Sequence, residues 1–393
     1  MANIQTYNSI APEGLSILTD RGHVVGPDVA APEGVLVRSA KLHDIELPPT
    51  VRAIARAGAG VNNIPVERCT EAGIVVFNTP GSNANSVKEL VIAGLLLSSR
   101  KILDGCAWVQ QLDPETTDVA KEVEAGKGAF TGPELLGKKL GVIGLGAIGV
   151  MVANAGVALG MEVIGHDPYL SVDSAWGLSR SVRRAASLDS LIGEVDYVTV
   201  HVPLTDTTRH MINGDLLTRA RPGLRVLNFS RDALVDDGAI LSAIQSGKVH
   251  SYVTDFPTGN LLGKPGIIAI PHLGASTPEA ETNSAIMAAQ ELVDFLEQGN
   301  IQRSVNFPEC RMERNGGDRI ILANKNIPNM VGQVTTVLAE AGMNISDMLN
   351  RHRNGVAYNI IDVDGAVPTA VEDQLRRIEG VKMVRVIPAP EGA

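Results

Sequence analysis

The fold prediction starts from the stretch Leu140-Gly141-Val142-Ile143-Gly144-Leu145-Gly146-Ala147-Ile148-Gly149. Its apolar first part is typical of a buried parallel strand, and a helical pattern from Val150 to Leu159 follows the last glycine. Glycines in this spacing, between a strand and a helix, favour a dinucleotide-binding turn because they allow a tight bend and a close approach of the backbone to a pyrophosphate. We therefore predict phosphate binding at the N-terminus of the helix, by Gly144, Gly146, Ala147, Ile148 and Gly149.

A carboxylate follows the next predicted strand, which runs from Glu162 to Gly165. Asp167 lies about twenty residues beyond the glycine turn, where a carboxylate accepts hydrogen bonds from the adenosine ribose hydroxyls. The same charge repels a 2′-phosphate. The sequence therefore predicts NAD rather than NADP as the cofactor.

The composition is that of a globular α/β protein with more than one domain. The chain has 393 residues, of which 44% are hydrophobic and 3% aromatic, so its cores must be built from Val, Ile, Leu and Ala. A net charge of −10 argues against a nucleic-acid or anionic-membrane partner. Three cysteines far apart in the sequence predict neither disulfides nor a metal site, and an N-terminus without an apolar signal segment favours the cytoplasm.

Secondary-structure patterns continue on both sides of the glycine turn. A helix is expected from Ser86 to Ile102, with Ser86 and Glu89 as a capping box, and a long helix from about Pro278 to Gln298. The basic run Arg180 to Arg184 is expected to be a solvated surface loop. Predicted strands before the turn are Val35–Val37, Ala53–Ala55 and Ile74–Phe77, and those after it are Leu140–Ile143, Glu162–Gly165, Tyr197–Val200, Arg225–Leu227, His250–Thr254 and Ile267–Ile270.

Motifs spread over nearly the whole chain resemble the D-2-hydroxyacid dehydrogenase family, and within it the D-3-phosphoglycerate dehydrogenases. They include the segments 35–40, 56–64, 77–90, 201–204, 228–236 and 271–277. The resemblance implies NAD-dependent oxidation of 3-phospho-D-glycerate to 3-phosphohydroxypyruvate, the first step of serine synthesis. Oxidation of another D-2-hydroxyacid, such as glycerate or lactate, is the alternative, and a non-catalytic NAD-binding regulator is a less favoured one.

The resemblance also implies roles for individual residues. Arg231, in Asn228 to Asp236, clamps the 2-oxo-acid group, for which a permanently charged planar guanidinium is suited. His272 is the general acid/base, a role for which histidine is suited because it titrates near working pH. Pro203 and Asp255 are expected to contact the cofactor. Substrate binding is expected from Arg38, Arg56, Ala59, Gly60 and Asn83, together with Arg231, the two other arginines reaching the substrate's phosphate.

One departure from the family concerns the acid/base site. Gly259 stands where the family has a glutamate that orients the histidine, and Thr254 replaces an aspartate that contacts nicotinamide. Loss of a carboxylate beside His272 would weaken the stabilisation of its charged form and loosen its orientation. We hypothesise that Asp255 or Lys88 compensates, although a lysine on the helix surface is the simpler interpretation of Lys88.

The C-terminal part has a βαββαβ pattern and resembles an ACT domain, a small module that commonly senses amino acids. Asn326 and Asn344 match positions that bind serine in regulated relatives, so a serine effector is expected; the alternative is that this module only pairs subunits.

The resulting fold prediction is an α/β protein in which a Rossmann-type NAD-binding domain is inserted in a flavodoxin-like substrate domain, with a ferredoxin-like ACT-like domain at the C-terminus. The predicted bounds are 1–97 with 282–307 for the substrate domain, 98–281 for the NAD-binding domain and 318–393 for the ACT-like domain. A homodimer or homotetramer is expected, without nucleic acid or membrane as a partner.

Overall fold

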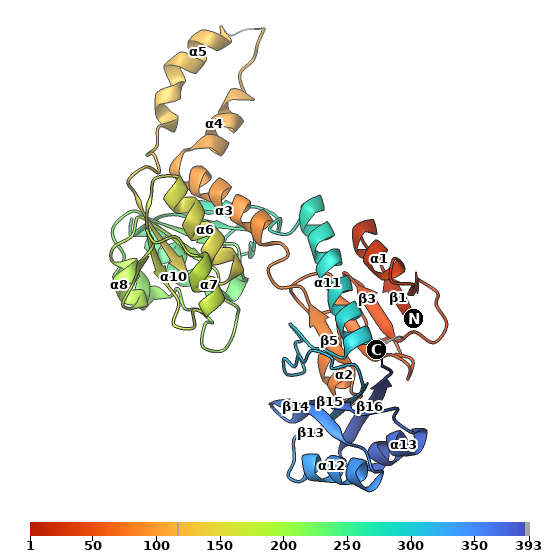
Figure 1. Cartoon of the computed structure of the whole chain (residues 1–393). Coiled ribbons are helices and arrows are strands. Elements are labelled where there is room, and N and C mark those ends of the chain that lie inside the picture. The colour runs from red at the N-terminus through yellow and green to blue at the C-terminus, as the bar shows by residue number, and fades with distance from the viewer. Residues whose placement is uncertain (116–117, 390–393) are drawn as a thin grey trace. The chain divides into compact units, whose positions relative to one another are not determined.

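The computed structural model describes residues 1–115 and 118–389, and the chain forms two compact units. Unit 1 consists of Met1–Ser82 and Glu281–Ala393, and unit 2 consists of Asn83–Ala280. The chain therefore passes from one unit to the other at residues 82–83 and returns at residues 280–281. Figure 1 shows the order of the elements along the chain.

Unit 1 contains a parallel five-stranded sheet in the order β2-β1-β3-β4-β5, which confirms the flavodoxin-like prediction. One face of the sheet, with Leu36 and Phe77, packs against Leu292 and Phe295 of the long helix α11. The other face contributes Val35 and Val76 to a second core. The elements are β1 (Asn3–Tyr7), α1 (Pro12–Thr19), β2 (Val24–Gly26), β3 (Gly34–Val37), β4 (Ala53–Arg56), α2 (Val66–Glu71), β5 (Val75–Asn78) and α11 (Pro278–Gln298).

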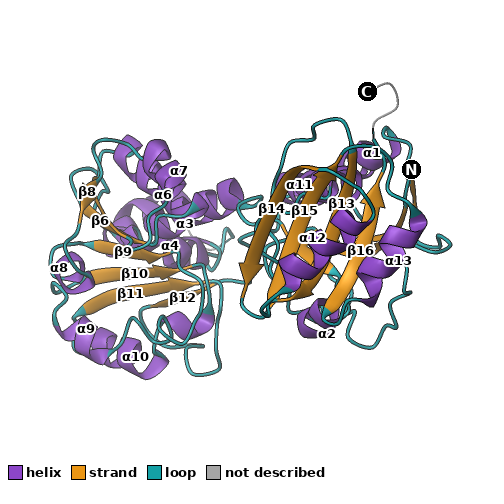
Figure 2. Ribbon diagram, turned by 60° about the horizontal axis from the view of Figure 1, so that its bottom comes forward, coloured by secondary structure: helices purple, strands orange, loops and turns teal. Residues whose placement is uncertain are grey.

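The C-terminal βαββαβ module is an antiparallel sheet in the order β14-β15-β13-β16, with α12 and α13 on one face (Figure 2). Its elements are β13 (Asp318–Lys325), α12 (Met330–Glu340), β14 (Ile345–Arg353), β15 (Val356–Val363), α13 (Thr369–Arg377) and β16 (Val381–Ile387). Because β13 and β15 place alternate side chains on opposite faces, Ile321 and Tyr358 join the core of α11 while Ile320 and Ile361 pack under the helices. The module predicted as a separate domain thus shares a hydrophobic core with the first sheet.

Unit 2 contains a parallel seven-stranded sheet in the order β12-β11-β10-β9-β6-β7-β8, the doubly wound arrangement predicted from the glycine turn. Helices α3 and α6 cover one face, and α8, α9 and α10 cover the other. The strands are β6 (Lys139–Ile143), β7 (Glu162–His166), β8 (Arg183–Arg184), β9 (Tyr197–Val200), β10 (Leu224–Asn228), β11 (Val249–Thr254) and β12 (Ile267–Ala269). The helices are α3 (Ala84–Ser99), α4 (Ile102–Val109), α5 (Val119–Gly126), α6 (Ala147–Ala158), α7 (Val172–Gly177), α8 (Leu188–Ile192), α9 (Gly214–Thr218) and α10 (Asp237–Gln245), with 3-10 turns at Lys127–Phe130 and Asp232–Leu234.

Helix α3 differs from its prediction at both ends. It begins at Ala84 after Asn83, so Ser86 lies inside the first turn and is buried, and the predicted capping box is wrong. It ends at Ser99, and the extended backbone of Arg100 separates α3 from α4. Val87, Val91 and Leu95 pack into the core of unit 2, which is why the chain changes units before α3 and not near Leu97.

Helices α4 and α5 project from the rest of unit 2 as an arm (Figure 1). Within their described lengths neither helix contains a buried residue. In the described ranges, no helix is long and apolar enough to cross a membrane, and no group of three or more His, Cys, Asp or Glu side chains is arranged to hold a metal ion.

Candidate active site at the carboxyl edge of the unit 2 sheet

The glycine turn joins β6 to α6 at the point where the strand order reverses, between β6 and β9. Gly144 has a φ of +87°, and a Cβ at this position would lie 2.5 Å from the carbonyl oxygen of His201. At Gly149 a Cβ would lie 1.9 Å from the carbonyl oxygen of Gly144, so only glycine lets α6 approach the turn this closely. Gly146 faces open space, and no side chain in the described structure caps α6 there. The first N–H groups of α6 are thus directed at a site that a phosphate fits.

Asp167 follows β7 and is connected to this turn. Its carboxylate accepts hydrogen bonds from the backbone N–H groups of Leu145 (2.8 Å) and Tyr169 (2.8 Å). It also lines a pocket of about 280 Å³ together with Gly165, Leu178, Arg183 and Arg184 among others. The position and size of this pocket fit an adenosine group beside the turn. Arg183 and Arg184, expected in a surface loop, instead form the short edge strand β8 that walls this pocket.

Arg231 lies in the loop after β10, and its backbone is fixed by a buried asparagine. Asn228 is fully buried; its amide donates to the carbonyl of Arg231 (2.8 Å) and to the hydroxyl of Tyr252 (3.2 Å), and it accepts from the N–H of Ser230 (3.1 Å). The side chain of Arg231 remains exposed. Sequence reasoning did not assign Asn228 this role, although it begins the motif that contains Arg231.

His272 lies in the loop after β12, and β11 separates that strand from β10. The imidazole of His272 is exposed but packs on Phe256, with ring centroids 4.4 Å apart and an angle of 49° between the rings. Asp255 directly follows β11, between the loops of Arg231 and His272, and is 1% exposed. Since adjacent strands are roughly 5 Å apart, the loops of Arg231 and His272 begin roughly 10 Å from each other. Pro203 follows β9 at the same edge, and its carbonyl accepts a hydrogen bond from Thr208 (2.7 Å).

The residues predicted to bind substrate divide between the units. Arg38, Arg56, Ala59 and Gly60 lie at the carboxyl edge of the unit 1 sheet, whereas Asn83 begins unit 2. Arg56 donates from Nε to the carbonyl of Arg38 (3.0 Å), which holds the two arginines side by side, and Arg38 forms an ion pair with Glu281. Among the described residues, no acceptor pairs with the backbone N–H of Ala59 or Gly60.

Asn326 and Asn344, the predicted effector residues, are exposed and lie at opposite ends of the C-terminal sheet. Asn326 follows β13 at the end where Lys325 pairs with Val356, and Asn344 precedes β14 at the end where Ile345 pairs with Val363. A strand of this length spans about 25 Å. One chain therefore does not bring the two amides together.

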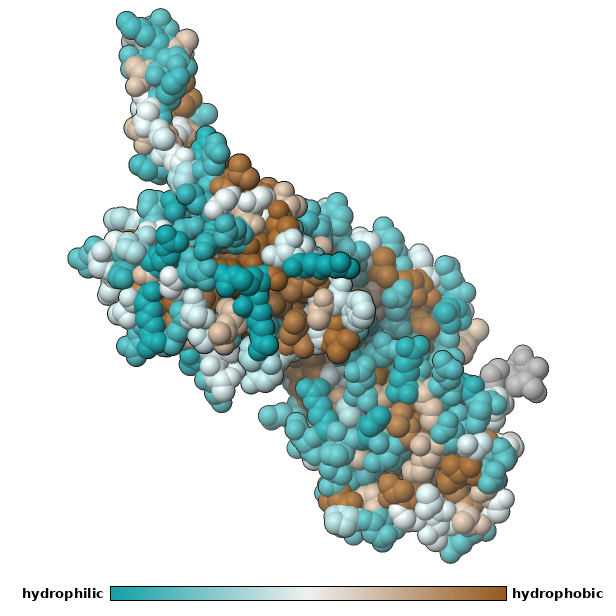
Figure 3. All heavy atoms as spheres, turned by 60° about the vertical axis from the view of Figure 1, so that its left-hand side comes forward, coloured by the Kyte–Doolittle hydropathy of each residue, from teal (hydrophilic) through white to brown (hydrophobic). Residues whose placement is uncertain are grey.

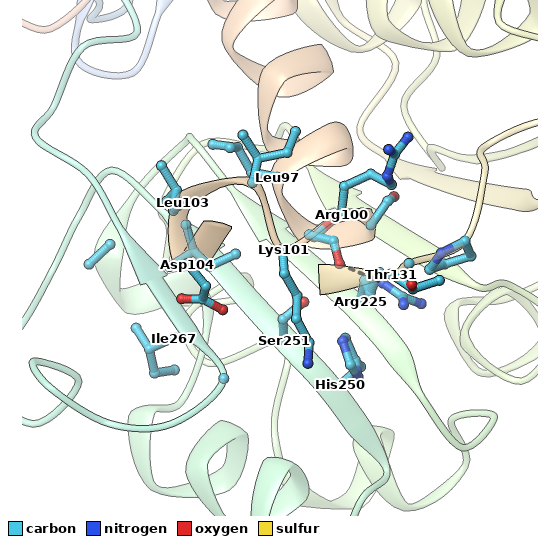
Figure 4. Close-up of a pocket in the computed structure, with 18 residues that line it drawn as sticks. Leu97, Arg100, Lys101, Leu103, Asp104, Thr131, Arg225, His250, Ser251 and Ile267 are labelled. Atoms are coloured by element: carbon cyan, nitrogen blue, oxygen red, sulfur yellow. Dashed lines mark hydrogen bonds between the residues drawn. The ribbon is translucent and has the colours of Figure 1, made fainter. Parts of the chain in front are cut away.

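A larger pocket, of about 480 Å³, lies at the other edge of the unit 2 sheet (Figure 4). Arg225, His250 and Ile267 stand near the amino ends of β10, β11 and β12, and Lys101 and Thr131 come from the two sides of the arm's base. Because Arg231, Asp255 and His272 follow the carboxyl ends of the same strands, this pocket is not part of their site.

The comparisons with known proteins agree with this geometry. Residues 95–274 match the family described as "D-isomer specific 2-hydroxyacid dehydrogenase, NAD binding domain". A D-3-phosphoglycerate dehydrogenase of Methanocaldococcus jannaschii is 35% identical over 297 residues, which cover 74% of this chain and 54% of that relative. The chain belongs to the D-isomer specific 2-hydroxyacid dehydrogenase family.

Other members of the family give the same result. A D-3-phosphoglycerate dehydrogenase of Bacillus subtilis is 32% identical over 285 residues, or 70% of this chain and 52% of that relative. The chain thus spans about half the length of the curated relatives it matches. The solved NAD⁺-bound 3-phosphoglycerate dehydrogenase of Entamoeba histolytica has a TM-score of 0.59 at 25% identity and covers 78% of this chain and 98% of its own. NAD is accordingly the cofactor of this dehydrogenase domain, and the glycine turn and Asp167 fit it.

Replacing Asp167 by serine is expected to reduce the preference for NAD over NADP, measured as the ratio of kcat/KM values, by about ten- to a hundred-fold. The change removes the ribose acceptor and the charge that repels a 2′-phosphate, while Arg183 and Arg184 remain in the pocket. Asp173→Ser, an exposed carboxylate on α7, is the matched control and should leave the ratio unchanged. An unchanged ratio in Asp167→Ser, with the fold verified by circular dichroism, would contradict the assignment.

Proposed function

We propose that this dehydrogenase oxidises 3-phospho-D-glycerate to 3-phosphohydroxypyruvate with NAD, the first step of L-serine biosynthesis. The observation that carries the proposal is the placement of Arg231, Asp255 and His272 on three neighbouring loops at the same sheet edge as the glycine turn. The curated relatives named D-3-phosphoglycerate dehydrogenase support this substrate over another D-2-hydroxyacid. The non-catalytic alternative is less well supported, because both Arg231 and His272 are present.

In the proposed reaction, Arg231 binds the carboxylate of the hydroxyacid and fixes the orientation of C2. NAD⁺, when bound, supplies the acceptor for the hydride that leaves C2. An imidazole nitrogen of His272 takes the proton of the C2 hydroxyl, so that the hydroxyl becomes a carbonyl and the imidazole becomes an imidazolium. Phe256 restricts the ring of His272 by contact, and Asn228 holds the backbone of Arg231, so both groups are oriented before substrate binds.

We assign the phosphate of the substrate to Arg38 and Arg56, and its carboxylate also to the backbone N–H groups of Ala59 and Gly60. The adjacent arginines at one strand edge support this assignment, as do the N–H groups without an acceptor. Asn83 and the cofactor contacts of Pro203 and Asp255 remain predictions. Arg38 forms an ion pair with Glu281. When substrate binds, its phosphate must therefore displace Glu281 from the guanidinium or bind the guanidinium together with Glu281.

A substrate panel tests the proposal. With NAD, kcat/KM for 3-phospho-D-glycerate should exceed that for D-glycerate and D-lactate by at least about a hundred-fold, since a phosphate paired with arginine contributes several charge-assisted hydrogen bonds. In Arg56→Gln, kcat/KM for the phosphorylated acid should fall while that for D-glycerate stays the same. A preference for an unphosphorylated acid would overturn the substrate assignment and leave the reaction class intact.

We further propose that the arm pairs two copies of the chain, as a homodimer or within a homotetramer. Helices of eight residues are not stable in water without packing, yet α4 and α5 expose Ile102, Leu103, Val109 and Val119. In Figure 3, hydrophobic side chains gather at the base of the mostly hydrophilic arm. Light scattering should give a multiple of 41.5 kDa for the wild type and a smaller mass for Ile102→Asp/Leu103→Asp.

The C-terminal module is proposed to act as an ACT-like sensor of serine. Asn326 and Asn344 lie at opposite ends of its sheet, so a site that uses both amides has to form between two modules. Titration of serine against activity tests the proposal, and loss of inhibition in Asn326→Ala would support it. A cytoplasmic location remains a prediction.

A further inference from the structure

Asp255 is a buried carboxylate that no side chain of the described residues pairs with by a hydrogen bond or an ion pair. It is 1% exposed, and in the described part of the chain neither of its oxygens accepts a hydrogen bond from a side chain. Burial raises the pKa of Asp255 above its ordinary value, whereas the charge of His272, the backbone N–H of Gly274 and the charge of Arg231 lower it. An unpaired buried carboxylate is costly unless a cation faces it. The burial of the Asp255 carboxylate therefore needs a functional explanation.

The surroundings of Asp255 direct it toward the loop of His272. A Cβ on Gly274, two residues after His272, would lie 3.5 Å from Oδ2 of Asp255. The ring of the neighbouring Phe256 packs on the imidazole of His272, with 4.4 Å between the ring centroids. Tyr252 also interacts electrostatically with Asp255, and its hydroxyl accepts a hydrogen bond from the amide of Asn228 (3.2 Å). Asp237, a second carboxylate near Tyr252, accepts a hydrogen bond from Thr258 (2.6 Å). Neither Tyr252 nor Asp237 supplies a positive charge. His272 and Arg231 are therefore the groups whose positive charge can stabilise the carboxylate of Asp255.

We propose that Asp255 is the positioning carboxylate of the acid/base site, which stabilises the imidazolium formed on His272 during hydride transfer. In the form that accepts the proton the imidazole is neutral, so Arg231 is then the cation that offsets the buried negative charge. When His272 takes the hydroxyl proton, the new positive charge meets a carboxylate that water does not screen. The interaction is therefore stronger in the transition state than in the ground state, which is the condition for catalysis. This inference rests on the proposed function.

Two other positions were open to this role, and their surroundings argue against them. The Nζ atom of Lys88 lies 3.7 Å from Oε1 of Glu89 on α3. Because Lys88 is a cation, it would also oppose the protonation of a nearby imidazole. Gly259 has no side chain, and nothing lies within 4 Å of the Cβ it would carry. Position 259 therefore has room for a glutamate, which supplies the means for a rescue experiment.

The test compares Asp255→Asn with the wild type and with Asp255→Asn/Gly259→Glu. Asparagine keeps the shape and removes the charge, so kcat for oxidation should fall about a hundred-fold. The acidic limb of the pH–kcat profile should move to lower pH by about one pH unit, because the imidazolium loses its counter-charge. NADH binding, followed by fluorescence, separates this role from the predicted cofactor contact of Asp255, because only loss of the cofactor contact would weaken it. The added glutamate should restore part of kcat and return the limb toward its wild-type position. Asp215→Asn, an exposed carboxylate on α9, is the matched control.

Each other outcome is decisive. An unchanged kcat and pH profile in Asp255→Asn would overturn the inference, and so would a loss of kcat with the acidic limb in place. Weakened NADH binding with a normal pH profile would assign Asp255 to the cofactor alone. If Asp255→Asn does not fold, Gly259→Glu in the wild-type background should still move the acidic limb to higher pH, and no movement would count against the proposal. A wild type that oxidises no 2-hydroxyacid would instead contradict the proposed function itself.

Discussion

Replacing His272 by asparagine is expected to lower kcat for hydroxyacid oxidation by about 10²- to 10⁴-fold, the usual contribution of a general acid/base. Asparagine has nearly the same size and is neutral, but it cannot accept the hydroxyl proton at working pH. The hydride then has to leave an alcohol that keeps its proton, which raises the barrier to the developing carbonyl. The measurement is steady-state NADH formation, with NADH binding recorded in parallel.

The surroundings of His272 determine what should stay unchanged in this experiment. His272 is exposed and contacts Phe256, so its loss should leave the fold and NADH binding intact. His43→Asn, at an exposed histidine of unit 1, should keep wild-type kcat. If His272→Asn turned over at the wild-type rate, the acid/base assignment would be wrong, and with it the inferred role of Asp255.

Replacing Asp362 by alanine is expected to destabilise the C-terminal module by about 3–5 kcal/mol. Asp362 and Arg319 are both fully buried, and two hydrogen bonds join them, from Nε (2.6 Å) and from Nη2 (2.8 Å). Arg319 also donates to the carbonyls of Gln298, Met312 and Glu313, and so ties β13 to the end of α11 and to the segment that follows it. Alanine leaves the guanidinium buried without its counter-charge.

Hydrogen exchange measures the destabilisation by Asp362→Ala. The backbone amides of β13 and β15 are expected to exchange faster than in the wild type. Both tryptophans, Trp108 and Trp176, lie in unit 2, so the tryptophan fluorescence transition should change little. The exposed pair Glu372–Arg376 is the matched control, and Glu372→Ala should cost no more than about 1 kcal/mol. The double variant Arg319→Met/Asp362→Leu should recover most of the loss, since apolar side chains do not need a counter-charge. An Asp362→Ala protein with wild-type exchange would show that the pair contributes little.

Secondary structure with strong local signals was predicted well. Helix α11 has the predicted bounds, and the buried strands of unit 2 lie within a residue or two of theirs. The prediction was wrong at the start of α3, where packing of Val87 and Val91 on the unit 2 sheet, rather than a capping side chain, places the helix. It also missed β8, because two residues carry no periodicity and pair with β7 only through the tertiary fold.

The sequence by itself determined the glycine turn at Gly144 to Gly149 and predicted Asp167 as the ribose acceptor, because the glycine spacing and the following strand are local features. The resemblance to the family also predicted Arg231 and His272 as the substrate clamp and the acid/base. Only the tertiary structure decided that Asp255 is buried without a side-chain partner against the loop of His272, that Asn228 holds Arg231, and that the C-terminal module shares the core of α11. Burial and the satisfaction of polar groups depend on residues far apart in the chain, and no local pattern records them.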